Sequence, residues 1–358
     1  MSPKYQIKTF YEIDQNLIKE WESLWINAVN ATIFNSYPWF KATSKTKQLH
    51  KCVIYLCYQN DELVAILPLV EEKRFGIKVL TTHLGSYISD EAILLKEYNA
   101  QLLKELIVEI SKNNNLYLTR VSSTNVQDLK NIFPQIFFSV IGVNPIINLK
   151  GDPLSSFSKS SRKKLESILK KAGDMIVLKT FSEDDNLNEL LKVMIDIDTN
   201  SGKQKNSRDI FTKEEEKRFF ANLINYCRKY IEISILYYND KPIAYTFNLK
   251  GGKVYFGYQT SYLFEYRKLS PGKLVLMRSL KEIAHSGYNL LDCGEGLSAF
   301  KQEFTKDYKL KYDLHYSRNS LVMIWWKLII FARRAKQILL PEKNSRDYEF
   351  LFTTNLKG

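Results

Sequence analysis

The chain runs twice through the same succession of predicted elements: a helix, two strands joined by a tight turn, a second helix and a further strand. In the first half, the apolar runs at 53–58 and 63–70 are typical of strands on either side of a polar turn. In the second half, the runs at 231–238 and 243–249 flank the turn Asn239-Asp240-Lys241-Pro242 in the same way. Because helices alternate with hairpins, the sequence predicts a mixed α/β (α+β) fold with mixed sheets, built as two tandem copies.

The length agrees with this repeated order, since 358 residues are about twice the size of one ordinary domain. Gly151-Asp152-Pro153 is a sharp break between the halves. We therefore expect an N-terminal domain over 1–153, a C-terminal domain over 154–318 and a tail over 319–358. Hydrophobic residues make up 45% of the chain, which provides two cores without disulfides or a metal.

The formal net charge of +13 favours anionic partners. We expect a nucleotide cofactor and an anionic membrane surface, and we do not expect a nucleic acid. The four cysteines form no CxxC motif, and their spacing with the four scattered histidines does not suit zinc, so the sequence predicts no metal site. The first residues lack the apolar core of a signal peptide, and we expect a cytoplasmic protein that can lie at the inner face of the membrane.

One loop leads from the predicted strand 253–260 directly into an amphipathic helix over 272–286. The first turn of such a helix offers unpaired N–H groups and the positive end of the helix dipole, which together suit a pyrophosphate. Gly272 allows close approach of the ligand, and Pro271 removes one donor at the helix entry. The predicted phosphate-binding residues are Arg267, Ser270, Pro271, Gly272 and Lys273. The alternative is a basic loop that only caps a core helix.

This loop resembles the acetyl-CoA signature of GNAT acyltransferases: Arg or Gln, two residues, Gly, any residue, then Gly or Ala. Arg267 and Gly272 match the signature, and Ser270 stands in place of its first glycine. Further motifs, in their order, resemble the CelD/BcsL-like acetyltransferases of exopolysaccharide clusters, relatives of the peptidoglycan-bridge aminoacyltransferases. These motifs are FNSYPWF at 34–40, VAILPL at 64–69, SRKK at 161–164, KPIAYTF at 241–247, and SPGKL, GYNLLDCGEG and FKQEFT between 270 and 305.

The resemblance implies paired GNAT folds with one acyl-CoA site in the C-terminal copy. It further implies transfer of an acyl group from acetyl-CoA, or another acyl-CoA, to the amine of a small molecule or glycan such as an amino sugar in surface-polysaccharide synthesis. In this chemistry the amine attacks the thioester directly. Two alternatives stay open: an aminoacyl-tRNA-dependent transferase of the peptidoglycan-bridge type, and a GNAT-like scaffold without activity, which Ser270 favours.

The acids Asp292 and Glu295 follow the predicted strand 289–292 in the segment LLDCGEG. Acids at a strand end beside glycines often face a cleft, so we expect one of them to be the catalytic base, directly or through water; the alternative is that Asp292 caps a turn. Tyr258 precedes the phosphate loop and is the candidate acid for the thiolate, with packing as its alternative. Lys301 matches a basic family position and is expected to contact substrate, unless it is a solvated lysine.

The tail begins with an apolar segment at 320–340 that contains Trp325 and Trp326 and ends in Arg333, Arg334 and Lys336. This segment is too short and too basic to span a bilayer. We expect it to pack on its own domain or against a second protomer in a homodimer. The alternative is a peripheral position in the membrane interface, with its basic residues near anionic headgroups.

Overall fold

The computed structural model describes residues 5–47, 52–82, 87–155, 157–202 and 210–339. They form two compact units, which we describe one at a time. Unit 1 combines Met1–Phe40, Leu49–Asn144 and Lys309–Gly358, and unit 2 combines Lys41–Gln48 and Pro145–Tyr308.

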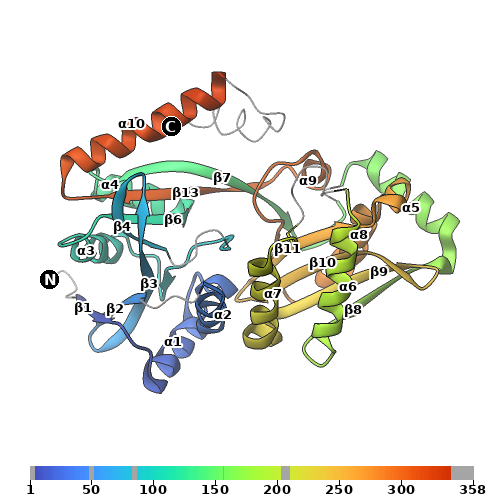
Figure 1. Ribbon diagram of the computed structural model, residues 1–358, viewed down its shortest axis with the longest axis horizontal. Coiled ribbons are helices and arrows are strands. Elements are labelled where there is room, and N and C mark those ends of the chain that lie inside the picture. The colour runs from blue at the N-terminus through green and yellow to red at the C-terminus, as the bar shows by residue number, and fades with distance from the viewer. Residues whose placement is uncertain (1–4, 48–51, 83–86, 156, 203–209, 340–358) are drawn as a thin grey trace. The chain divides into compact units, whose positions relative to one another are not determined.

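Unit 1 contains a mixed sheet with the strand order β1-β2-β3-β4-β6-β13-β7 (Figure 1). Only the β4–β6 pair is parallel among the pairings described for this unit. The strands are β1 (Tyr5–Phe10), β2 (Cys52–Gln59), β3 (Glu62–Arg74), β4 (Ile77–Thr82), β5 (Leu94–Leu95, paired with β3), β6 (Leu116–Ser122), β7 (Phe137–Asn148) and β13 (Tyr308–Tyr316). The helices are α1 (Gln15–Asn27), η1 (Ile33–Asn35), α2 (Tyr37–Lys47, which continues into unit 2), α3 (Ala100–Ile110), α4 (Ser123–Ile132) and α10 (Ser320–Leu339).

Unit 2 contains the strand order β12-β11-β10-β9-β8, and the last residues of β7 pair with β12. Its strands are β8 (Ile176–Phe181), β9 (Ile231–Tyr238), β10 (Lys241–Gly251), β11 (Val254–Tyr262) and β12 (Leu290–Asp292). Its helices are α5 (Lys159–Ala172), η2 (Gly173–Met175), α6 (Leu187–Thr199), α7 (Glu214–Cys227), η4 (Arg228–Tyr230), η5 (Phe264–Leu269), α8 (Pro271–Ile283) and α9 (Ala299–Gln302).

The two units repeat one architecture. The order β1-α1-α2-β2-β3-β4-α3-β6 of unit 1 has its counterpart in β8-α6-α7-β9-β10-β11-α8-β12 of unit 2. In both copies a parallel pair, β4–β6 or β11–β12, stands beside an antiparallel meander of three strands. This confirms the predicted mixed α/β fold in two copies.

The units do not follow the predicted bounds 1–153, 154–318 and 319–358. The chain leaves unit 1 after Asn144 and returns to it at Lys309. The return has a clear cause, because β13 pairs antiparallel with β6 of unit 1, from Lys311↔Ser122 to Tyr316↔Leu116. Helix α10 follows β13 directly and is part of the same unit.

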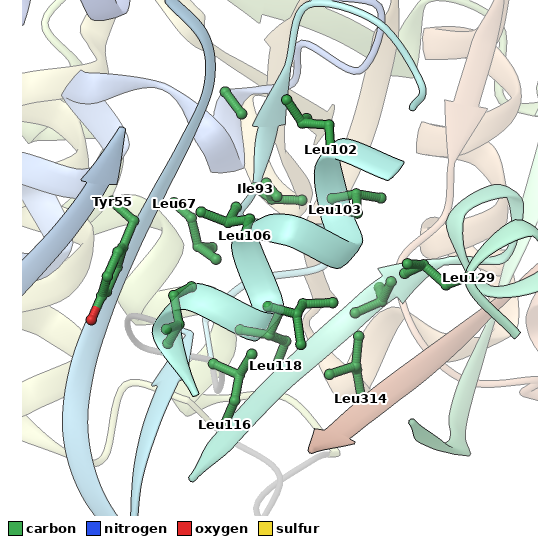
Figure 2. Close-up of a cluster of buried hydrophobic side chains, with 14 of the residues drawn as sticks. Tyr55, Leu67, Ile93, Leu102, Leu103, Leu106, Leu116, Leu118, Leu129 and Leu314 are labelled. Carbon is green, nitrogen blue, oxygen red and sulfur yellow. The ribbon is translucent and has the colours of Figure 1, made fainter. Parts of the chain in front are cut away.

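One core cluster of unit 1 lies between its sheet and helix α3 (Figure 2). The spacing of Leu102, Leu103 and Leu106 puts three leucines on one face of α3. They pack in one cluster with Leu116 and Leu118, which alternate with other residues along β6 and so point to the same side of the sheet. The helical and strand periodicities of the sequence therefore meet in a single core.

A buried cluster of charges lies in the same unit. Asp90 is 2% exposed and forms ion pairs with Lys309, at 3.1 Å, and with the fully buried Lys311. Burial alone would raise the pKa of Asp90, but the two ammonium groups hold it well below its usual value. Its neighbour Glu91 accepts hydrogen bonds from the amides of Asn30 (2.8 Å) and Asn125 (3.0 Å), so both buried carboxylates are satisfied.

We predict that Lys311→Met lowers the free energy of unfolding of unit 1 by about 3–5 kcal/mol, because it removes one of the two ammonium groups that pair with the buried Asp90 carboxylate. Urea unfolding followed by tryptophan fluorescence measures this change, since all five tryptophans lie in unit 1. Lys309→Met is the matched control and should cost less, because Lys309 is half-buried and Lys311 stays paired. Equal losses in the two variants would contradict the prediction.

Helix α10 packs one of its faces on unit 1. Trp326 is fully buried and forms a cluster with Met323 and with Val79 of β4, while the indole N–H of Trp325 donates to the carbonyl of Phe75 at 3.1 Å. His315 of β13 lies against Trp326, with ring centroids 5.6 Å apart. Within the described residues, no helix is both long and apolar enough to cross a membrane.

Burial lowers the pKa of His315 from 6.5 to about 3. The folded chain therefore keeps this imidazole neutral between those pH values, whereas the unfolded chain protonates it. Stability conferred by the neutral ring is present above pH 6.5 and is lost as the pH falls toward 3.

Lowering the pH from 7 to 5 should thus cost unit 1 about 2 kcal/mol through His315 alone. His315→Gln should remove that part of the loss. Urea unfolding at the two pH values, followed by tryptophan fluorescence, compares the variant with the native chain. An unchanged pH dependence in the variant would rule out His315 as its source.

Candidate functional site

Strands β11 and β12 of unit 2 run parallel and then separate. They pair only from Val254↔Leu290 to Phe256↔Asp292, where β12 ends, whereas β11 continues to Tyr262. In the described pairings, residues 257–262 have β10 on one edge and no strand on the other. Backbone N–H and C=O groups along such an edge can bind an extended ligand as a strand would.

A bulge lies in β11 at this point. Asn248 of β10 pairs with Gly257 and Phe247 pairs with Gln259, so Tyr258 is the extra residue. A bulge leaves one residue out of the hydrogen-bond ladder and bends the strand. The bulge therefore bends β11 where it separates from β12.

Helix α8 begins after this strand, one short 3-10 turn further along the chain. Ser270 precedes the helix in a left-handed conformation (φ 53°, ψ 51°), and its side chain makes no capping hydrogen bond. Its carbonyl accepts the N–H groups of Lys273 (3.0 Å) and Leu274 (3.1 Å). Glycine adopts this backbone conformation more easily than serine. Ser270 thus takes the left-handed path that a glycine of the signature would favour.

A cleft of about 560 Å³, including space open to solvent, runs between α8 and the sheet. Gly272 lines it at the first turn of α8 and Ile283 at the last, a span of about 16 Å along the helix. A Cβ atom at Gly272 would lie 3.6 Å from both Phe300 and Tyr262, an ordinary contact distance. The lining residues are Thr246, Asn248, Gly257, Gln259, Thr260, Gly272, Leu276, Ser279, Ile283, Leu291, Cys293, Phe300, Lys301 and Phe304.

Basic side chains lie near the beginning of α8. The ammonium of Lys273 is 2.5 Å from a carboxylate oxygen of Glu303, which also accepts the hydroxyl of Ser161 on α5 at 2.9 Å. The hydrogen bond from Lys273 lowers the pKa of Glu303. The exposed Arg267 has its guanidinium carbon 4.5 Å from the centre of the Phe264 ring. Of the predicted phosphate-binding residues, Gly272 alone lines the cleft, and Arg267 and Lys273 flank the helix start.

The turn after β12 approaches β11 closely. Asp292 is 1% exposed, and its carboxylate accepts the N–H of Gly294 at 2.8 Å. Gly294 has φ +73°, and a Cβ there would lie 3.4 Å from the carbonyl oxygen of Gly257. The ammonium of Lys301 donates to the carbonyls of Gly294 (2.9 Å) and Glu295 (2.7 Å). Asp292 therefore stabilises the turn, which is the role that we gave as the alternative to catalysis. Lys301 stabilises the same turn from the cleft side. The side chain of Glu295 is exposed.

The predicted acid Tyr258 lies among aromatic side chains. The Tyr258 ring packs with Phe219, Phe220 and Phe247, at centroid distances of 6.2 to 6.4 Å. This is the structural role that we gave for Tyr258 as the alternative to an acid. It is not among the side chains that line the cleft in the described part of unit 2. Burial raises the pKa of Cys293 to about 12, which keeps it a thiol.

Three polar residues of the cleft, Thr246, Asn248 and Ser279, are absent from the candidates that the sequence predicts. Thr246 and Asn248 alternate along β10 and hydrogen-bond to each other at 3.2 Å. The buried hydroxyl of Ser279 on α8 has no hydrogen-bond partner in the described structure. Polar residues at alternate positions of an otherwise apolar strand are the signal that could have indicated this lining.

The corresponding helix start in unit 1 is capped. Helix α3 is the counterpart of α8, but the side chain of Asn99 caps its first turn by accepting the N–H of Leu102 at 3.1 Å. The amide of Asn99 also donates to the hydroxyl of Tyr5. This helix start therefore uses its own side chain where α8 leaves its first turn uncapped.

Comparison with protein families identifies the second half of the chain. Residues 155–302 match the model of the acetyltransferase (GNAT) domain. The matched segment contains the separated strands, α8 and the turn after β12. The chain thus contains a segment similar to the acetyltransferase (GNAT) domain within unit 2. None of the curated proteins matches this chain in sequence.

Solved structures share the fold over most of the chain. FemX has a TM-score of 0.61 at 13% identity, over 88% of this chain and 98% of FemX. A conserved protein of unknown function from Bacteroides thetaiotaomicron has a TM-score of 0.59 at 13% identity, over 87% of this chain and all of that one. L-PGS from Bacillus licheniformis has a TM-score of 0.55 at 11% identity, over 88% and 96%. At these identities the similarity concerns the fold, which is that of tandem GNAT-like domains.

The turn after β12 can be tested through Asp292. Asp292→Ala leaves the Gly294 N–H without this acceptor and should lower the free energy of unfolding by about 1–3 kcal/mol. Asp292→Asn keeps an oxygen at the same place and should cost clearly less. Thermal unfolding followed by far-ultraviolet circular dichroism compares them, and equal losses would show that the hydrogen bond does not hold the turn.

Proposed function

We propose that this chain transfers an acyl group from acetyl-CoA, or another acyl-CoA, to an amine, with the donor bound in unit 2. The observation that carries the proposal is the open edge of β11 beside the uncapped first turn of α8. In this proposal the pyrophosphate lies at the helix start, near Gly272 and Lys273. The pantetheine arm extends along residues 257–262 and replaces the missing strand.

The chemistry needs few groups from the protein. The amine nitrogen attacks the thioester carbonyl, the C–N bond forms, and the C–S bond breaks as the thiolate leaves. Backbone N–H groups at the β11 bulge stabilise the negative oxygen of the intermediate. The amine gives its proton to a base, for which Asp292 and Glu295 stay the candidates, directly or through water. The contacts of the Tyr258 ring with phenylalanines favour a structural role for this residue over protonation of the thiolate.

For the acceptor, we propose an amino sugar or a related amine in surface-polysaccharide synthesis. This part rests on the resemblance of the sequence motifs to the CelD/BcsL-like acetyltransferases. Lys301 is proposed to contact substrate from the cleft wall. Its ammonium is held by two backbone carbonyls, so its position is fixed.

A second candidate is an aminoacyl-tRNA-dependent transferase. The net charge of +13 favours it, because RNA is a strongly anionic partner. A third candidate, a scaffold without activity, was suggested by Ser270 in place of glycine. The left-handed Ser270 weakens this argument, since the loop keeps the path that a glycine would favour.

Thermal-shift titration with acetyl-CoA, longer acyl-CoAs and CoA tests the proposal. A ligand at about 100 times its Kd should stabilise unit 2 by about 2.7 kcal/mol. Gly272→Glu should abolish the shift, because its side chain has to enter the space of Phe300 and Tyr262 and brings negative charge to the phosphate site. Gly272→Ala is the matched control and should keep the shift, since its Cβ meets only ordinary contacts.

Each result points to one candidate. A shift with acyl-CoA that Gly272→Glu removes supports the donor site at α8. A shift that survives in a folded Gly272→Glu variant puts the donor elsewhere. No shift with any acyl-CoA, but one with aminoacyl-tRNA, favours the second candidate, and no shift with either favours the scaffold.

A further inference from the structure

Helix α10 exposes a second apolar face. The large side chains on it are 49% to 73% exposed, and their spacing of three and four residues aligns them on one side of the helix. We call this face the outer stripe; it consists of Leu321, Ile324, Trp325, Leu328 and Phe331. Met323 and Trp326, which pack on unit 1, lie on the opposite side. Water thus contacts apolar side chains over five positions of one helix, although a different face already anchors it.

The charge on this helix has one sign. Its charged residues are Lys327, Arg333, Arg334 and Lys336, and it contains no aspartate or glutamate. An apolar stripe accompanied only by basic residues is the composition of helices that lie in the surface of anionic membranes. A symmetric contact between two copies of α10 would bring like charges together without an acidic partner on the helix, which is unfavourable.

We propose that α10 docks unit 1 on the surface of a bilayer that contains anionic phospholipids. The outer stripe enters the boundary between headgroups and acyl chains, and the helix lies flat and does not cross the bilayer. The hydrogen bond from the Trp325 indole to the Phe75 carbonyl fixes this ring at the edge of the stripe. Aromatic rings of this kind are typical of the membrane interface.

Vesicle binding by the full chain tests this directly. Vesicles of phosphatidylglycerol and phosphatidylcholine should co-sediment the protein, and phosphatidylcholine alone should bind it at least about tenfold more weakly. Trp325 is half-exposed, whereas Trp21, Trp39 and Trp326 are at most 1% exposed. Its fluorescence should therefore shift to shorter wavelength on binding, and Trp325→Phe should remove most of that shift.

The decisive variant is Leu328→Glu with Phe331→Glu. Both side chains are exposed, at 57% and 72%, so the fold should be kept, while vesicle affinity should fall about tenfold or more. Ile26→Glu is the matched control, because Ile26 is 75% exposed on α1 of the same unit. It should leave vesicle binding unchanged.

Three results would overturn the proposal. The first is vesicle binding that the double variant does not weaken. The second is a chain that ignores vesicles but forms a dimer in sedimentation equilibrium, with the double variant monomeric; the stripe then binds a second copy. The third is a monomer that does not bind anionic vesicles at all.

Discussion

The separation of β11 from β12 is the constraint from which the second unit takes its form. The two strands share three residue pairs and then leave an edge of backbone groups without a neighbouring strand. That edge has to stay open, and the turn after β12 keeps it so. Gly294 comes close to Gly257, Asp292 holds the Gly294 N–H, and Lys301 holds the carbonyls of the turn. The open edge, the bulge and the uncapped start of α8 therefore belong to one arrangement.

The first unit shows what the same architecture looks like without this arrangement. It repeats the parallel pair and the helix beside it, but Asn99 caps the start of α3. Its buried polar groups serve a different purpose, since Asp90 and Glu91 are paired with lysines and amides inside the unit. Of the two equivalent helices, α3 thus begins with a side-chain cap and α8 begins without one.

Much of this fold could be predicted because its signals are local. The hairpin β2–β3 and the helices α3 and α8 follow from apolar periodicity and turn residues, and the structure confirms them. Strands β1 and β4 were missed because they are short and only half apolar. The place of β13 depends on pairing with β6, nearly 200 residues earlier in the chain, and no periodicity indicates such a partner.

The candidate site was likewise predictable only in its local features. The helix start at Gly272 was readable from Pro, Gly and the basic residues around it. The roles of individual side chains could not be predicted, because they depend on contacts in the folded chain. Lys301 donates hydrogen bonds to backbone carbonyls, and the ring of Tyr258 packs against phenylalanines. Local chemistry predicts where a site begins, whereas only the packing decides which side chains reach it.

The return of the chain to unit 1 has a consequence for synthesis. The ribosome makes Asp90 long before its counter-ions Lys309 and Lys311, which follow 219 and 221 residues later. At about 5–20 residues per second this delay lasts about 10–45 s. Until then β6 lacks its neighbour β13, and the carboxylate lacks both ammonium groups. The C-terminal unit, nearly continuous in sequence, can thus complete its fold before the N-terminal one.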